Sequence, residues 1–161
     1  MANEIEQAFP FVDMPSFAEI PNHDQGCHEC SQLAEDVDAI RGRPIGGEEI
    51  RQLHQELSHL SAKSWQWLLP HYLRYCATPE AEYNKFETEF LLYSLSPLER
   101  FEGDANNRLK FITDSQIQTL LNLLRCFSTD EYWGKYCSAE LQRGISFLKK
   151  VLVGRRVPRS E

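Results

Sequence analysis

The residues best suited to chemistry stand together in the sequence HDQGCHEC, residues 23–30. Thiolates and imidazoles are preferred ligands of zinc, and two cysteines separated by two residues form the usual half of a tetrahedral site. His23, Cys27 and Cys30 could therefore supply three zinc ligands. The cysteine pair could instead be redox-active, because the N-terminus of a helix lowers the pKa of a thiol placed there.

A third interpretation of this segment, as the start of a helix, fits the rest of the sequence best. The sequence contains no second Cys-x-x-Cys pair, so a fourth zinc ligand would have to come from His54 or His59. A thioredoxin-type redox pair requires a βαβ context, which the surrounding pattern does not show. We therefore expect Cys27 and Cys30 to face the core as small apolar side chains, and we predict no cofactor. A zinc-binding structural or regulatory module is the alternative.

Apolar residues recur at helical spacing through most of the chain, as at Leu33 and Val37. Ser61, Thr78 and Thr113 each precede such a pattern and are residue types that cap helix N-termini. No strand-like alternation of useful length occurs, so the sequence predicts an all-α fold, a bundle of five or six helices. The expected helices are residues 28–40, 48–58, 62–77, 79–95, 114–128 and 130–152.

The length of 161 residues favours a single helical domain over residues 1–161. Its first part, residues 1–26, is rich in proline and is expected to form an N-terminal arm that lies on the core, with a short helix near residues 2–8. Residues 97–110 show the weakest periodicity and predict a loop. Residues 153–161 are basic and predict a flexible tail.

The apolar stripes of consecutive helices identify the expected core. The glutamates of the stretch from residue 80 to residue 89 lie in a polar region and are expected to form a solvated helix side. Predicted core residues are Trp65, Leu69, Leu73, Phe90, Leu120, Leu124, Trp133, Leu141 and Leu148.

The net charge of −7 is distributed unevenly along the chain. Residues 1–60 carry twelve acidic and three basic side chains, a charge of −9, whereas the remaining residues carry fourteen basic and twelve acidic side chains, a charge of +2. An acidic surface repels phosphate and attracts basic proteins, so nucleic-acid binding is disfavoured. The sequence shows no membrane span and no signal-peptide pattern, which predicts a cytoplasmic protein that does not bind membranes.

The acidic first third is either a solvated face that favours solubility or a binding face for a protein partner, and the proposed partner role rests on the second interpretation. Its carboxylates are expected to steer association, and an aromatic side chain, Trp67, is expected to anchor the partner because it lies off the main apolar stripe of its helix. The alternative is that Trp67 packs under the N-terminal arm. The predicted carboxylates are Glu29, Glu35, Asp36, Asp38, Glu48 and Glu49.

The sequence resembles an uncharacterised bacterial family of small α-helical proteins. The resemblance rests on IEQAF near the start, on Cys27-His28-Glu29-Cys30 opening a helix, and on WQWLLPHYLRY over residues 65–75. Small acidic helical proteins of this kind often accompany bacterial toxins as immunity proteins. The resemblance therefore implies a protein that neutralises a cognate toxin.

Three functions are compatible with the sequence. The sequence contains no Gly-rich phosphate loop, no HExxH and no GxSxG motif, so we expect a non-enzymatic immunity protein whose partner is a basic, nuclease-like toxin. The zinc module on His23, Cys27 and Cys30 is the second hypothesis. An enzyme whose site is assembled from scattered residues is the third.

Overall fold

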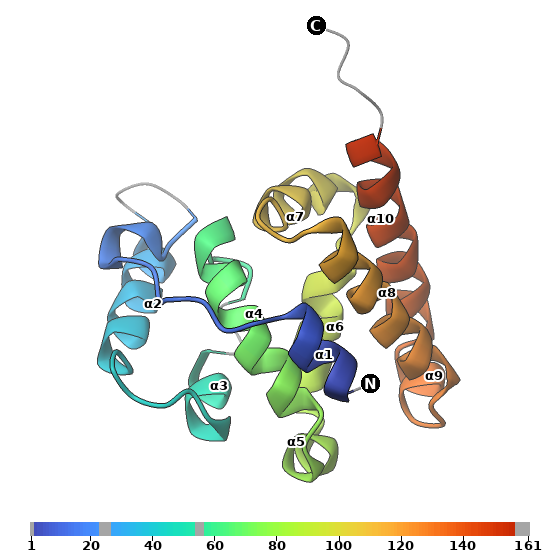
Figure 1. Ribbon diagram of the computed structural model, residues 1–161, viewed down its shortest axis with the longest axis horizontal. Coiled ribbons are helices and arrows are strands. Elements are labelled where there is room, and N and C mark those ends of the chain that lie inside the picture. Colours follow the sequence, from blue (N-terminus) through green and yellow to red (C-terminus); the bar gives the residue numbers. More distant parts are fainter. Residues whose placement is uncertain (1, 23–26, 54–56, 157–161) are drawn as a thin grey trace, which may run out of the picture.

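The computed structural model describes residues 2–22, 27–53 and 57–156, which are helical apart from their connections and one β-bridge between Pro21 and Leu60 (Figure 1). The all-α prediction is confirmed. Two short 3-10 helices are η1 (Phe17–Glu19) and η3 (Glu99–Phe101). The α-helices of the described residues are α1 (Ala2–Ala8), α2 (His28–Ala39), α3 (Gly47–Leu53), α4 (Ala62–Cys76), α5 (Pro79–Asn84), α6 (Phe86–Leu95), α7 (Glu102–Arg108), α8 (Asp114–Thr129), α9 (Trp133–Tyr136) and α10 (Ser138–Arg156).

The helices are arranged around α4, which runs through the middle of the molecule (Figure 1). The helix α10 packs along α8 and against α6 on one side, and α1 packs on both α4 and α8. On the other side, α2 and α3 pack together and α3 contacts α4. Among the described helices, none combines the length and the apolar character needed to cross a membrane.

The helix starts predicted from capping residues are confirmed. The hydroxyl of Ser61 accepts a hydrogen bond from the Ser64 amide at 3.2 Å, and Thr78 accepts one from the Ala81 amide at 3.3 Å. Thr113 begins α8 with a reciprocal pair of bonds to the side chain and amide of Gln116. These bonds satisfy amide groups that a helix N-terminus leaves without partners, so local sequence sets these three boundaries.

The prediction of five or six helices is wrong, because two of the predicted helices are broken and one predicted loop is helical. The expected helix 79–95 is interrupted at Lys85, whose backbone has a left-handed conformation with φ of 66°. The Lys85 amide still donates to the Ala81 carbonyl at 2.8 Å and closes α5. Helix α6 begins directly afterwards, so Lys85 is both the C-cap of α5 and the N-cap of α6.

The expected helix 130–152 is divided into α9 and α10. The carboxylate of Asp130 accepts hydrogen bonds from the amides of Tyr132 and Trp133, both at 2.9 Å, in the turn between α8 and α9. At Gly134 a Cβ atom would lie 2.7 Å from the backbone oxygen of Ser128. The chain can therefore turn this tightly only with glycine at that position.

The predicted loop 97–110 contains η3 and α7, and part of the predicted basic tail continues α10. Helix α7 buries only Ala105, so it produces no apolar stripe in the sequence. Helix α10 extends to residue 156 because Val151 and Leu152 are buried and the Arg155 guanidinium donates to the carbonyl of Leu109 at 2.7 Å. Residues 157–161 of the predicted tail lie outside the described residues.

The N-terminal arm crosses α4 and is held by both apolar and polar contacts. Phe9 and Ile20 are buried, and the Ser61 amide donates to the Ile20 carbonyl at 2.9 Å. The ring of Phe11 stacks on His71 of α4 with 4.4 Å between centroids. Of the predicted arm, these residues lie on the core, whereas residues 23–26 lie outside the described residues.

The predicted core is confirmed with one exception. Phe90 is only partly buried and packs against the edge of the core. The buried members of the predicted set are Trp65, Leu69, Leu73, Leu120, Leu124, Trp133, Leu141 and Leu148.

Candidate binding site

The cysteine segment begins helix α2. Cys27 is the N-cap residue and its thiol donates a hydrogen bond to the Glu29 carboxylate at 3.3 Å, whereas Cys30 is buried. Of the predicted zinc ligands, His23 lies outside the described residues, and the part of the chain that is described contains no group of three His, Cys, Asp or Glu side chains placed to hold a metal ion. Zinc binding at this segment therefore stays a prediction.

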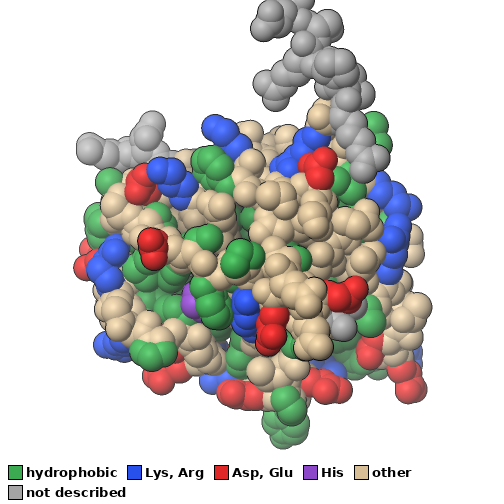
Figure 2. Space-filling view, viewed as in Figure 1, with side chains coloured by type: hydrophobic (Ala, Val, Ile, Leu, Met, Phe, Trp, Pro, Cys, Tyr) green, Lys and Arg blue, Asp and Glu red, His purple; other side chains and the backbone are tan. Residues whose placement is uncertain are grey.

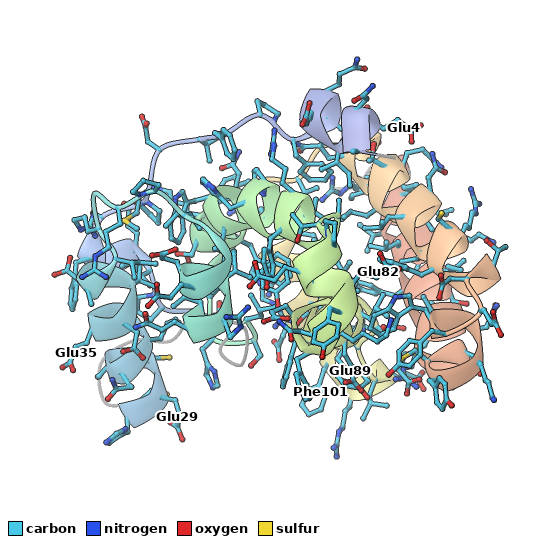
Figure 3. The ribbon with its side chains drawn as sticks, turned by 90° about the horizontal axis from the view of Figure 1, so that it is seen from below. Glu4, Glu29, Glu35, Glu82, Glu89 and Phe101 are labelled. Atoms are coloured by element: carbon cyan, nitrogen blue, oxygen red, sulfur yellow. The ribbon has the colours of Figure 1, made fainter. Side chains whose placement is uncertain are left out.

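The acidic side chains of the first third do not form one continuous face. Glu4 lies on α1, whereas Glu29 and Glu35 lie on α2 at the opposite side of the molecule and point outward (Figure 3). On η1, which packs against α2, the carboxylate of Glu19 forms an ion pair with Lys63. The charge of −9 along the sequence is therefore divided between separate surfaces.

The carboxylates predicted to bind a partner differ in how far they are engaged within the protein. Asp38 forms an ion pair with Arg41 at 2.8 Å, and the half-buried Glu49 accepts a hydrogen bond from the Gly46 amide at 3.0 Å. Asp36, also half-buried, accepts one from Gln32. Glu29, Glu35 and Glu48 are exposed.

The prediction that Trp67 is an exposed anchor is wrong. Its side chain is only 3% exposed, so it cannot reach a partner in the folded protein. Trp67 lies beside His71, with ring centroids 6.2 Å apart, and His71 in turn stacks on Phe11 of the N-terminal arm. The alternative, in which Trp67 packs beneath the arm, agrees with this arrangement.

Two of the exposed aromatic side chains, Tyr132 and Tyr136, line a groove of about 620 Å³ between α5 and α9. Residues of α1, α4 and α8, among them Ile5, Leu73 and Leu123, also line it. We name it the α5–α9 groove. Its polar and aromatic residues include Glu82, Lys85, Glu131, Tyr132, Trp133 and Tyr136.

Three aromatic rings of α9 and the turn before it form a connected cluster in this groove. The ring of Tyr132 lies edge-on to Trp133, with 5.0 Å between centroids, and 4.8 Å from the ring of Tyr136. Trp133 is buried, but Tyr132 is 39% exposed and Tyr136 is 64% exposed. Large aromatic side chains held in a fixed arrangement at the surface are typical of protein-binding sites.

Lys85 extends from the opposite side of the groove to this cluster. Its ammonium nitrogen lies 4.1 Å from the centroid of the Tyr132 ring and 5.5 Å from that of Trp133. The negative electrostatic potential of an aromatic face attracts a cation at this distance. Lys85 thus has both a left-handed backbone and a side chain that contacts the rings, and this contact joins the α5–α6 junction to α9.

Carboxylates accompany the aromatic cluster. Glu82 lies on the side of α5 that faces α8 and α9 (Figure 3), and Glu131 lines the groove beside Tyr132. Within the described ranges, neither carboxylate takes part in an ion pair with a lysine or arginine. Acidic side chains are visible along this edge of the molecule, over α5 and α9 (Figure 2). The groove also contains Lys135, whose ammonium lies 5.3 Å from the centroid of the Tyr136 ring. It therefore combines apolar faces with charges of both signs, of which the carboxylates of Glu82, Asp130 and Glu131 are the more numerous.

The two nearest thiols do not form a reactive site with this cluster. Cys76 lines the groove, but its burial raises the pKa of the thiol to about 12, so it remains protonated at neutral pH. Burial likewise raises the pKa of Cys137, which follows α9. Neither thiol is therefore available as a thiolate beside the aromatic cluster.

An ion pair between the partly exposed Arg51 of α3 and the buried Glu87 of α6 joins the helices on the far side of α5. The carboxylate of Glu87 is only 1% exposed and accepts a hydrogen bond from the Arg51 guanidinium at 2.9 Å. Arg51 also donates to Glu80 at 2.7 Å and to the Tyr75 hydroxyl at 2.9 Å. The expectation of a solvated glutamate side is therefore wrong at Glu87, because Arg51 of α3 makes its burial possible.

The groove residues were not recognised from the sequence as binding residues. Tyr132 and Tyr136 match a helical apolar stripe, and Glu82 matches a solvated helix face. The available signal was Gly134 within Tyr-Trp-Gly-Lys-Tyr, since a glycine there weakens a continuous helix. For Lys85 the sequence contains no comparable signal, because lysine does not mark a left-handed turn.

Residues 5–142 match a family described as "Family of unknown function (DUF6714)". No significant match was found among curated proteins. No solved structure matches the chain significantly.

Proposed function

Since this chain belongs to the DUF6714 family, whose function is unknown, we propose from its own surface that it is a non-enzymatic binding protein. Its partner is a protein with a basic and apolar surface, which it binds through the α5–α9 groove. One observation carries the proposal: the exposed rings of Tyr132 and Tyr136 stand beside the carboxylates of Glu82 and Glu131.

The groove has the two properties that a protein-binding site requires. Its aromatic rings offer apolar area whose rotamers are already restricted by contacts between Tyr132, Trp133 and Tyr136, so little conformational entropy is lost on binding. Its carboxylates favour partners of opposite charge and disfavour acidic ones. A basic protein that places an apolar side chain between its cations matches both properties.

Within this class, a toxin neutralised by the chain is the partner that we propose. A basic active cleft, as in nucleases, is complementary to the carboxylates of the groove. The exposed Glu29 and Glu35 on α2 then act at longer range, where they raise the association rate without contributing apolar contact.

The test is capture of partners from the native host with the wild-type chain and with two variants. In the groove variant, Tyr136→Ser and Glu131→Lys remove an exposed ring and reverse a neighbouring charge. In the control variant, Glu29→Lys and Glu35→Lys reverse charge on α2. Circular dichroism should be unchanged in both, since all four side chains are exposed.

We expect a basic protein that the wild type retains, that the groove variant loses, and that the control variant retains at low salt. A gene encoding this protein next to the gene for the chain, with growth arrest relieved by co-expression, would identify it as the toxin. A retained protein that is equally bound by the groove variant would contradict the proposed site.

A further inference from the structure

We infer that the α5–α9 groove recognises an arginine side chain of the partner at the rings of Tyr132 and Trp133, in the position that Lys85 now occupies. The inference rests on the proposed function and specifies the chemistry by which the partner is selected. In the unbound protein, Lys85 is an internal substitute for the guanidinium group of the partner.

The position of the Lys85 ammonium defines a cation-binding point. It lies 4.1 Å from the Tyr132 centroid and 5.5 Å from the Trp133 centroid, and these two rings are nearly perpendicular at 89°. A cation at this point therefore contacts two aromatic rings that are already held in place. The geometry is that of a partial aromatic cage for a positively charged group.

Lys85 fills this point without further bonding. Among the described residues no carboxylate lies within ion-pair distance of its ammonium group, although Glu82 and Glu131 line the same groove. The ammonium is thus held by the rings alone, on a flexible four-carbon chain. A contact of this kind at a partly exposed site is weak, so an incoming cation can replace it.

The backbone at Lys85 also sets this residue apart. Its φ of 66° makes it the one residue other than glycine with a left-handed backbone in the part of the chain that is described. Strained conformations are retained where the surrounding structure fixes them, and they occur often at binding sites. Glycine would adopt this conformation more readily, but it would provide no ammonium group for the rings.

An arginine from the partner matches the site better than Lys85 does. Its planar guanidinium can stack on Tyr132 while its N–H groups donate to a carboxylate, which a single ammonium on this strained residue does not achieve here. Glu131 immediately precedes Tyr132, and Glu82 lies across the groove. Lys135 is associated with the Tyr136 ring, so the carboxylates of Glu82 and Glu131 remain available to a guanidinium at Tyr132. Their charge favours a partner with an exposed arginine.

The experiment titrates N-acetyl-arginine-methylamide into the full chain and follows the assigned indole signal of Trp133 by NMR. The citrulline analogue, which has the same shape without the charge, is the matched ligand control. Three proteins are compared: wild type, Lys85→Gly, and Lys85→Gly combined with Tyr132→Leu. Circular dichroism checks that each remains helical.

We expect Lys85→Gly to bind the arginine amide about two- to fivefold more tightly than wild type, because the competing ammonium is absent. The gain should disappear with Tyr132→Leu, and no protein should prefer the citrulline analogue. Equal binding by wild type and Lys85→Gly, or no binding by either, would overturn the inference. If the host partner still depended on Tyr136 and Glu131 in the capture experiment, the proposed function would stand while the arginine site would be rejected.

Discussion

The stability of two variants at Lys85 tests whether the strained backbone and the ring contact have opposing effects. Lys85→Ala removes the ammonium from the Tyr132 and Trp133 rings but leaves a Cβ atom on a left-handed backbone. Lys85→Gly removes both. The difference between these variants therefore isolates the backbone contribution from the side-chain contribution.

The two contributions are of similar size. A cation–π contact at a partly exposed site stabilises by about 0.5–1 kcal/mol. A left-handed backbone costs a residue with a Cβ atom roughly 1–2 kcal/mol relative to glycine, although the greater freedom of glycine in the unfolded chain offsets about 0.4–1 kcal/mol of that difference. Lys85→Ala should therefore lower the free energy of unfolding by about 0.5–1 kcal/mol, whereas Lys85→Gly should remain within about 0.5 kcal/mol of wild type.

Urea unfolding followed by circular dichroism measures these free energies, and an unchanged slope with denaturant would show that both variants unfold in the same way. The wild type and both variants are compared at one pH and salt concentration. If Lys85→Ala and Lys85→Gly were equally stable, the backbone strain would be no larger than the stability lost through the greater freedom of glycine in the unfolded chain. If Lys85→Ala matched wild type, the rings would not stabilise the ammonium.

Three further predictions concern other parts of the protein. Leu124→Ala should lower the free energy of unfolding by about 2–5 kcal/mol, because Leu124 of α8 is fully buried against Gly144 of α10. A variant with unchanged thermal unfolding would refute the place of Leu124 in the core. Replacing both Cys27 and Cys30 with serine should lower stability modestly and leave helicity independent of metal, so stoichiometric zinc in the wild type that is lost with the fold in this variant would contradict the helix-start interpretation. Hydrogen bonds from Lys63 and the nearby Ser16 lower the pKa of the Glu19 carboxyl from its usual 4.5 to about 2. The stability that this carboxylate contributes is therefore present above pH 4.5 and lost as the pH falls toward 2. Glu19→Gln should abolish that part of the acid dependence when unfolding is measured as a function of pH.

The parts of the fold that could be predicted from the sequence are those set by short-range interactions. Ser61, Thr78 and Thr113 bond to amides three residues away, so their role is visible in the local sequence. The break at Lys85 was not predictable in this way, because lysine does not mark a left-handed backbone and the ring that its ammonium contacts, Tyr132, is distant in sequence. Helix α7 was missed because one buried alanine, Ala105, produces no periodic signal.

Most of the candidate site could not be predicted from the sequence either, because it depends on contacts between residues that are distant in sequence. The α5–α9 groove combines segments from α1, α4, α5, α8 and α9, and no single stretch contains its chemistry. Trp67 was misassigned because its position on the helix did not reveal that His71 and the arm cover that side. Glu87 was misassigned because its counter-charge, Arg51, lies on another helix.

The most direct test of the proposed function is the dissociation constant between the purified chain and the basic protein captured from the host. Isothermal titration calorimetry should compare wild type with Tyr136→Ser, whose exposed ring can be removed without loss of core packing. We predict that Tyr136→Ser weakens binding at least about tenfold, which corresponds to about 1.4 kcal/mol at a central aromatic contact. An unchanged dissociation constant for Tyr136→Ser would contradict binding through the α5–α9 groove.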